Sequence, residues 1–211
     1  MTTQQLSKLS SYHYLVDKHG KEKAFDKINN RLKKDNSDYK LEKLKRGVAV
    51  YRHKDGDSVM NLKGTDIKNY KDIMSDIKLG LGLSKYDKQF QSRGKQIDNY
   101  LDKEKSGSVV LTGHSLGSSI ITQHLSKSPS SLSKIKSAQL FNTGYTIPFH
   151  SELTTGIDKQ HRKNMKKKIT HHRIKGDIIS NTLGNVSVGN VETYETDEGN
   201  KHSLSHFSSV G

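Results

Sequence analysis

Apolar residues along this chain follow two spacings, and each spacing predicts a different kind of element. Over the first 35 residues they recur every three or four positions, as in residues 24–32, and this recurrence predicts helices. Two short apolar runs at residues 48–52 and 58–62 then flank the turn dipeptide Asp55-Gly56. Together they predict a β-hairpin or meander.

The second half of the chain alternates apolar runs with helical spacing. Residues 90–101 predict a helix that ends near Lys105. Runs typical of buried strands follow, and a last strand is predicted close to the end; these strands span residues 108–112, 137–142, 169–174 and 189–195. The order strand, helix, strand predicts a mostly parallel sheet with flanking helices, which is the α/β class.

The length of 211 residues suits one domain, and a chain of this length can bury a core. We expect a single domain over residues 1–211, with residues 1–45 as a helical N-terminal extension packed on it. The apolar content of 30% is low, so this core lies under a strongly charged surface. No apolar run is long enough to span a membrane. The lack of cysteine and of a visible signal peptide favours the cytoplasm, and the alternatives are export by a non-classical route or packaging in a particle.

Basic residues outnumber acidic ones by 36 to 22, and the net charge of +14 favours anionic partners. The most biased segment runs from Lys159 to Arg173 and contains seven Lys or Arg, three His and no acid. It is either a solvated surface or a peripheral contact with anionic membrane lipids. Nucleic acid is a less favoured partner, because no nucleic-acid-binding motif accompanies the charge. The absence of cysteine excludes disulfides, thiolate metal sites and a cysteine nucleophile.

One sequence motif indicates catalytic chemistry. The segment Gly113-His114-Ser115-Leu116-Gly117 has the pattern G-x-S-x-G, directly after a predicted strand and directly before a predicted helix. That setting is the one a nucleophile elbow requires, because the serine must adopt a strained backbone to lift its hydroxyl above the sheet. The residues two before and two after the serine crowd each other, so both must be glycine.

With its context, this motif resembles the class 3, fungal-type lipase family of the α/β-hydrolases. Three further segments are similar to family segments: Met60–Asp66, Gly176–Ser180 and Lys201–Phe207. The resemblance as a whole extends over residues 45–207. The chain departs from the family at two positions, since Lys63 replaces an arginine and Ser118 replaces a glycine. The resemblance implies a three-layer α/β-hydrolase sandwich that needs no cofactor or metal.

The resemblance also implies a catalytic triad of Ser115, Asp177 and His202. Their order along the chain, serine then acid then histidine, is that of α/β-hydrolases. Most of the eleven histidines are expected at the surface, and only His202 and His206 follow Asp177. We favour His202, because Ser203-Leu204 matches the family segment better. The two histidines are spaced to hold a metal on a helix, but no third ligand falls at a recognisable spacing.

The same resemblance places the oxyanion hole at the backbone N–H groups of Leu116 and Thr65. Residues 65–91 contain apolar positions between glycines, and they form either a lid over the site or an ordinary helix on the sheet. The expected function is hydrolysis of carboxylic esters of lipids, as in a triacylglycerol lipase. The alternatives are a phospholipase A1-like or small-ester esterase activity on the same triad, or a basic binding protein on an inactive hydrolase scaffold.

Overall fold

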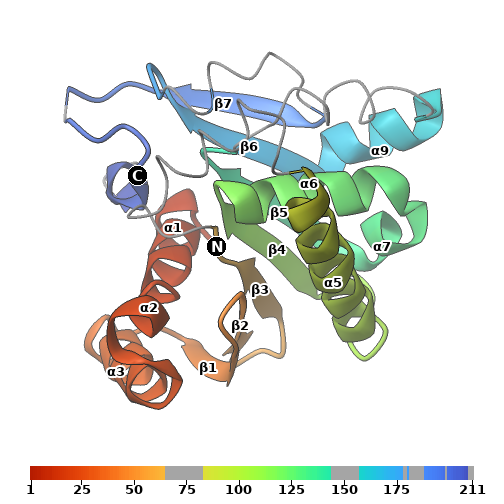
Figure 1. Cartoon of the computed structure of the whole chain (residues 1–211). Helices are drawn as coiled ribbons and strands as arrows, with labels where there is room; N and C mark the ends of the chain where they lie inside the picture. The colour runs from red at the N-terminus through yellow and green to blue at the C-terminus, as the bar shows by residue number, and fades with distance from the viewer. Residues whose placement is uncertain (65–82, 144–156, 178–179, 181–187, 198, 209–211) are drawn as a thin grey trace.

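A seven-stranded sheet forms the centre of the computed structural model, which describes residues 1–64, 83–143, 157–177, 180, 188–197 and 199–208 (Figure 1). The strands lie in chain order across the sheet: β1 (Tyr39–Leu44), β2 (Val48–His53), β3 (Ser58–Leu62), β4 (Val109–His114), β5 (Ile135–Phe141), β6 (Ile169–Ile174) and β7 (Asn190–Tyr194). The first three strands are antiparallel, and β3 to β7 are parallel. This mostly parallel sheet with flanking helices confirms the predicted α/β class.

One face of the sheet is covered by the helices that connect the parallel strands (Figure 1). They are α5 (Leu83–Leu101), α6 (Leu116–Lys127), α7 (Pro129–Lys134) and α9 (Lys159–Lys168). Because crossover connections are right-handed and the strands follow one another in sequence, all these helices fall on the same side. Their apolar residues form one core with alternate strand positions such as Val109 and Leu111.

The opposite face is covered by the two ends of the chain. The N-terminal helices α1 (Thr3–Tyr12), α2 (Leu15–His19) and α3 (Lys21–Lys34) share a second core with the short C-terminal 3-10 helix η2 (Leu204–Ser208). Val110, between the two strand positions of the first core, points into this second core. The N-terminal helices therefore supply the third layer of the fold.

The prediction that residues 1–45 are helical is wrong for its last part, because Tyr39–Leu44 form the edge strand β1. Only Leu41 and Leu44 of this strand are buried, and a bulge interrupts its pairing with β2 between Leu41 and Lys43. Edge strands need apolar residues on one side only and often carry lysine on the other. The expected helix after the hairpin is α5, which ends at Leu101, four residues before the predicted end.

Most of the segment predicted as a lid or a packed helix, residues 65–91, lies outside the described residues, and only the first part of α5 overlaps it. Within the described part of the chain, no helix has the length and apolar character needed to cross a membrane.

Candidate active site

Ser115 lies in a sharp turn between β4 and α6. Its backbone has φ 54° and ψ −121°, in the region that residues with a side chain rarely adopt. The turn is held by a hydrogen bond of 3.0 Å from the Ser115 N–H to the carbonyl of Phe141 at the end of β5. The sequence expectation of a strained serine at a strand–helix turn agrees with this geometry.

The two glycines of the motif are required by close backbone contacts. A Cβ atom on Gly113 would lie 2.8 Å from the backbone nitrogen of Ser118, so the turn leaves no room for it. A Cβ on Gly117 would collide with the carbonyl of Leu62, so the larger constraint at Gly117 comes from β3 rather than from Gly113. Ser118, which departs from the family pattern, is buried and donates to the Phe141 carbonyl at 3.2 Å.

The structure brings Asp177 and His202 together. Asp177 follows β6 at the carboxyl edge of the sheet and is 2% exposed. His202 Nδ1 lies 3.0 Å from Asp177 Oδ2, so we assign the Nδ1 proton to this hydrogen bond. The other ring nitrogen, Nε2, is then the basic one, as a general base requires.

His206, the alternative to His202, has a different environment. Its Nε2 lies 2.6 Å from the carbonyl of Asn200, and its Nδ1 lies 3.4 Å from the hydroxyl of Thr196. Because a carbonyl only accepts, Nε2 is the protonated nitrogen of His206. These two contacts of His206 hold the loop before η2, while the contact with Asp177 belongs to His202.

Ser115 and His202 are connected through His114. The rings of His114 and His202 lie with centroids 4.8 Å apart, and His114 Nε2 lies 2.8 Å from the carbonyl of His202. The Ser115 hydroxyl makes no hydrogen bond to a described residue, His202 included. Such bonds are often long before substrate binds. Ser115 thus directly follows His114, whose ring contacts His202, and no hydrogen bond joins Ser115 to His202 itself.

A tyrosine from the N-terminal layer completes this connection. Burial lowers the pKa of His114 to about 3, so its ring is neutral. Since its Nε2 donates to the His202 carbonyl, its Nδ1 must accept, and the hydroxyl of Tyr14 donates to it at 2.8 Å. Two successive hydrogen bonds, from Tyr14 to His114 and from His114 to the His202 carbonyl, therefore connect the N-terminal helices to the backbone of the proposed base.

Lys63 and Gly64, which precede the predicted oxyanion residue Thr65, are fixed by contacts with several elements. The Lys63 carbonyl accepts from Arg93 at 2.7 Å, and the buried Lys63 ammonium forms an ion pair with the more exposed Asp17. At Gly64 a Cβ would lie 2.5 Å from the His114 carbonyl and 3.1 Å from Ser115 Cβ, so this backbone passes directly beside the serine.

The two predicted oxyanion donors differ in what the structure describes. Thr65 lies outside the described residues. Leu116 is the first residue of α6, where backbone N–H groups lack acceptors within the helix and carry the positive end of its dipole. Among the described residues, no cluster of three or more histidine and acidic side chains is arranged to hold a metal.

Sequence reasoning did not find Tyr14, Asp17 and Arg93, although all three contact the site. Tyr14 and His114 are 100 positions apart, and no local pattern links them. The one sequence signal for a carboxylate partner such as Asp17 is the lysine at position 63, where the resembled family has an arginine.

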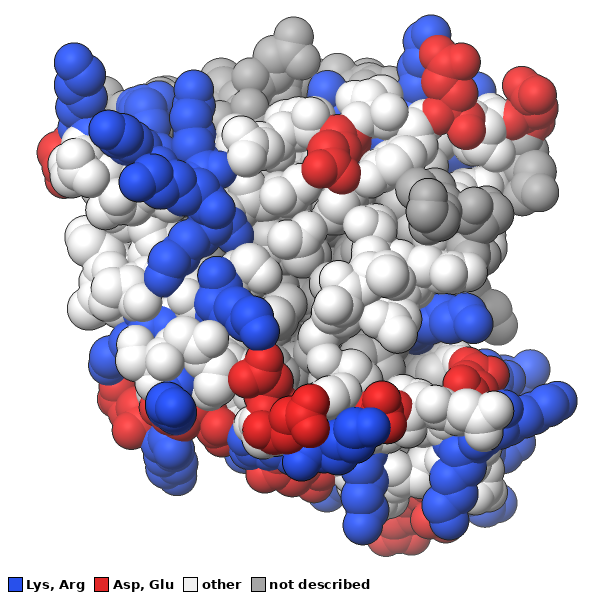
Figure 2. Space-filling view, turned by 180° about the vertical axis from the view of Figure 1, so that it is seen from behind, with Lys and Arg blue, Asp and Glu red and all other residues white. Residues whose placement is uncertain are grey.

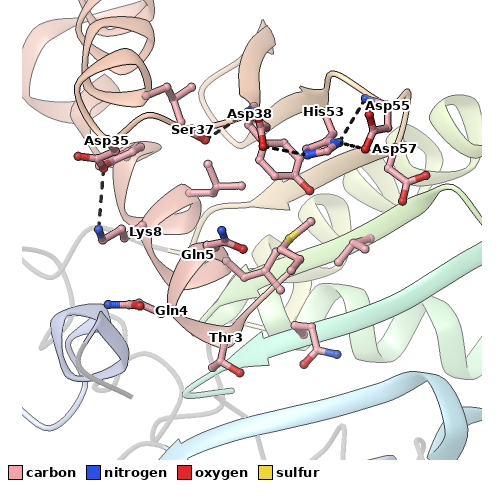
Figure 3. Close-up of a pocket in the computed structure, with 18 of the residues that line it drawn as sticks. Thr3, Gln4, Gln5, Lys8, Asp35, Ser37, Asp38, His53, Asp55 and Asp57 are labelled. Atoms are coloured by element: carbon pink, nitrogen blue, oxygen red, sulfur yellow. Dashed lines mark hydrogen bonds and ion pairs between the residues drawn. The ribbon is translucent and has the colours of Figure 1, made fainter. Parts of the chain in front are cut away.

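The large pocket of about 730 Å³ in Figure 3 lies elsewhere, between α1 and the hairpin of β2 and β3. Four aspartates line it, and each is paired: Asp35 with Tyr12 and Lys8, Asp38 with Lys54 and His53, Asp55 with His53, Asp57 with Lys136. These carboxylates already have partners, so we assign the pocket no role in the chemistry at Ser115.

The expectation that most histidines lie at the surface is wrong. Seven are buried within the described part of the chain: His13, His114, His161, His171, His172, His202 and His206. Burial lowers the pKa of His13 and His171 to about 4 and that of His114 to about 3, and burial likewise lowers the pKa of His172.

This burial predicts that the protein loses stability as the pH falls below about 6.5. In that range the unfolded chain binds protons on His13, His114, His171 and His172, whereas the folded protein does not until pH 4 or below. Each such histidine lowers the unfolding free energy by about 1 kcal/mol at one pH unit below 6.5. The unfolding free energy measured by urea denaturation should therefore be lower at pH 5.5 than at pH 7.5 by several kcal/mol, on the order of a few tenths of a typical stability of about 10 kcal/mol.

Removing one of these groups gives the control. In a His171→Asn protein the change in unfolding free energy between pH 6.5 and 5 should be smaller by about a quarter, because one fewer proton is taken up on unfolding. A stability that stays flat from pH 7.5 to 5 would contradict the prediction.

No family model matches the chain, and no curated protein matches it by sequence. Among solved structures, lipase II from Rhizopus niveus is similar, with a TM-score of 0.39 and 15% identity. The match covers 95% of this chain and 81% of that chain. The proposal below therefore rests on this chain's own residues.

Proposed function

We propose that the protein is a serine hydrolase that cleaves carboxylic ester bonds of lipids. The observation that carries the proposal is the juxtaposition of a serine in a strained strand–helix turn with a buried histidine–aspartate pair. Ser115 has φ 54°, and His202 Nδ1 lies 3.0 Å from Asp177 at the same edge of the sheet. Carboxyl edges of parallel strands are where α/β folds place their sites.

The proposed mechanism follows from the hydrogen-bond roles. His202 Nε2 takes the proton of the Ser115 hydroxyl while Ser115 attacks the ester carbonyl, and Asp177 stabilises the resulting imidazolium. The backbone N–H of Leu116 and a donor at Thr65 stabilise the oxyanion, each by about 3 kcal/mol. His202 then protonates the leaving alcohol, and water cleaves the acyl-enzyme by the same route.

A fluorophosphonate probe tests the proposal, because only an activated serine reacts with it. We expect one adduct, located on Ser115 by mass spectrometry of the digested protein, and none on the Ser115→Ala protein. A panel of esters with graded acyl lengths then separates lipid esters from small esters. Absence of labelling would favour the alternative of a binding protein on an inactive scaffold.

The outer face of α9 supports a proposed contact with anionic membrane. Figure 2 shows Lys and Arg side chains gathered over the end of the molecule that holds α9. Lys159, Lys163, Lys166 and Lys167 are exposed, and no described carboxylate forms an ion pair with them. The first turn of α9 packs against the last turn of α6, where His161 Nε2 lies 2.9 Å from the Leu125 carbonyl, so this basic face lies at the end of α6 away from Ser115.

Lys168 does not belong to this face. Its ammonium donates to the carbonyls of Leu132, Ser133 and Ile135, so it satisfies the backbone at the end of α7. Desolvation lowers its pKa, in keeping with this partly buried position. A test of the basic surface must leave Lys168 in place.

Replacing Lys159, Lys163, Lys166 and Lys167 by glutamine should reduce hydrolysis on vesicles of anionic lipid and spare a soluble short-chain ester. Each lysine near an anionic surface contributes about 1 kcal/mol of binding, so the loss on vesicles should exceed tenfold. Added salt should weaken vesicle binding of the wild type, because the Debye length falls from about 10 Å at 0.1 M to about 3 Å at 1 M.

The matched control removes the same charge from α3, on the other side of the molecule in Figure 1: Lys21, Lys23, Lys33 and Lys34 to glutamine. These lysines are exposed as well. If both variants lose vesicle activity equally, net charge rather than the α9 face is responsible. If neither does, the basic run is a solvated surface.

A further inference from the structure

A buried asparagine after β5 lies where the three segments of the proposed triad meet. Asn142 is 0% exposed and has φ 41°, one of three positive values among the described residues other than glycine. The preceding residue, Phe141, accepts the N–H of Ser115 at 3.0 Å. The N–H of Asn142 itself donates to the carbonyl of His172 in β6 at 2.8 Å.

The side-chain amide of Asn142 bridges the loops that carry Asp177 and His202. Its Oδ1 accepts from the N–H of Ile174 at 3.1 Å, and its Nδ2 donates to the carbonyl of Lys201 at 3.1 Å. The carbonyl of Ile174 in turn accepts from the N–H of Asp177 at 3.1 Å, and Lys201 directly precedes His202. One amide therefore joins the backbone that presents the acid to the backbone that presents the base.

We propose that Asn142 is a positioning residue that holds Asp177 and His202 at hydrogen-bond distance, an inference that rests on the proposed function. The partners fix the amide orientation, because the Ile174 N–H can only donate and the Lys201 carbonyl can only accept. Aspartate has no donor at neutral pH, and an apolar residue would leave both buried groups unsatisfied. Asparagine also tolerates a positive φ better than most residues.

The His202 backbone is consequently held at two successive carbonyls. Asn142 holds the carbonyl of Lys201, and His114 holds the carbonyl of His202. Both contacts act on the main chain, so they fix the backbone from which the imidazole reaches Asp177. Loss of the Asn142 contact should therefore displace the ring from Asp177 without removing either group.

The test uses Asn142→Gly, which deletes both hydrogen bonds and suits φ 41°. We expect kcat for a short-chain ester to fall about 10²-fold at an unchanged KM, because a displacement of about 1 Å in a catalytic group has an effect of this size. The matched control is Asn36→Gly. Asn36 has φ 49° but is exposed and lies between α3 and β1, so its replacement should leave kcat and KM unchanged.

A second readout does not depend on activity. The proton between His202 Nδ1 and Asp177 should give a strongly downfield proton NMR resonance, identified by its loss in His202→Ala. We expect this resonance to broaden or move upfield in Asn142→Gly and to stay in place in Asn36→Gly. If Asn142→Gly fails to fold, Asn142→Asp serves instead, because it keeps the acceptor for Ile174, loses the donor to Lys201 and adds a carboxylate that repels the Lys201 carbonyl, so kcat should fall at least as far.

Wild-type kcat and an unmoved resonance in the folded variant would overturn the proposal. If the wild-type protein hydrolyses no ester but the resonance changes in the Asn142 variant alone, the positioning role stands and the proposed function fails.

Discussion

Replacing Ser115 by alanine is expected to lower ester hydrolysis by about 10⁴- to 10⁶-fold while the protein stays folded. Alanine keeps the Cβ atom and the strained backbone at φ 54° and removes only the hydroxyl oxygen. That oxygen makes no hydrogen bond to a described residue, so its loss should change the unfolding free energy by no more than about 0.5 kcal/mol. Initial rates on a chromogenic ester and thermal unfolding followed by circular dichroism measure the two effects.

Ser119→Ala makes the same chemical change one turn further along α6. Its hydroxyl contacts the Ser115 carbonyl at 3.3 Å within the helix, so this variant should keep near-normal activity. Full activity in Ser115→Ala would end the hydrolase proposal. Equal losses in both variants would mean that the first turn of α6, rather than the nucleophile, had been damaged.

The elements that could be predicted well from the sequence are those in which buried residues recur at a regular spacing. The run predicted at residues 108–112 overlaps β4, where burial on both sides leaves a near-continuous apolar signal. The hairpin of β2 and β3 also lies where the turn dipeptide indicated. The edge strand β1 was missed because only two of its residues are buried, and their spacing is equally compatible with a helix.

The turn around Ser115 could be predicted because its chemistry is local. A strained serine between a strand and a helix needs small neighbours, and these stand two residues away on either side. The supporting contacts could not be predicted in this way. The amide of Asn142 reaches Lys201 over 59 positions, and Tyr14 reaches His114 over 100, so nothing in the local sequence records either pair.

The N-terminal helices are more closely tied to the site than a peripheral extension would be. All the crossover helices lie on one face of the sheet, so the other face is covered by the two ends of the chain. That cover supplies Tyr14 to His114 and Asp17 to Lys63. Truncation of these helices would therefore remove one of the two cores and two supports of the proposed site together.

The two C-terminal histidines are expected to differ sharply when each is replaced by alanine. His202→Ala should match Ser115→Ala, because it removes the proposed base, which is paired with Asp177 at 3.0 Å. His206→Ala removes the contact with the Asn200 carbonyl and should lower the thermal stability, with a loss of activity below about tenfold.

Added imidazole distinguishes loss of a base from loss of structure. It should restore part of the activity of His202→Ala, since the cavity left beside Asp177 can admit a free imidazole ring, and it should do nothing for His206→Ala. Both rates are measured on the same short-chain ester, with circular dichroism to establish that each variant is folded. If His206→Ala were inactive and rescued by imidazole while His202→Ala stayed active, the base would lie on η2 and the contact with Asp177 would be structural.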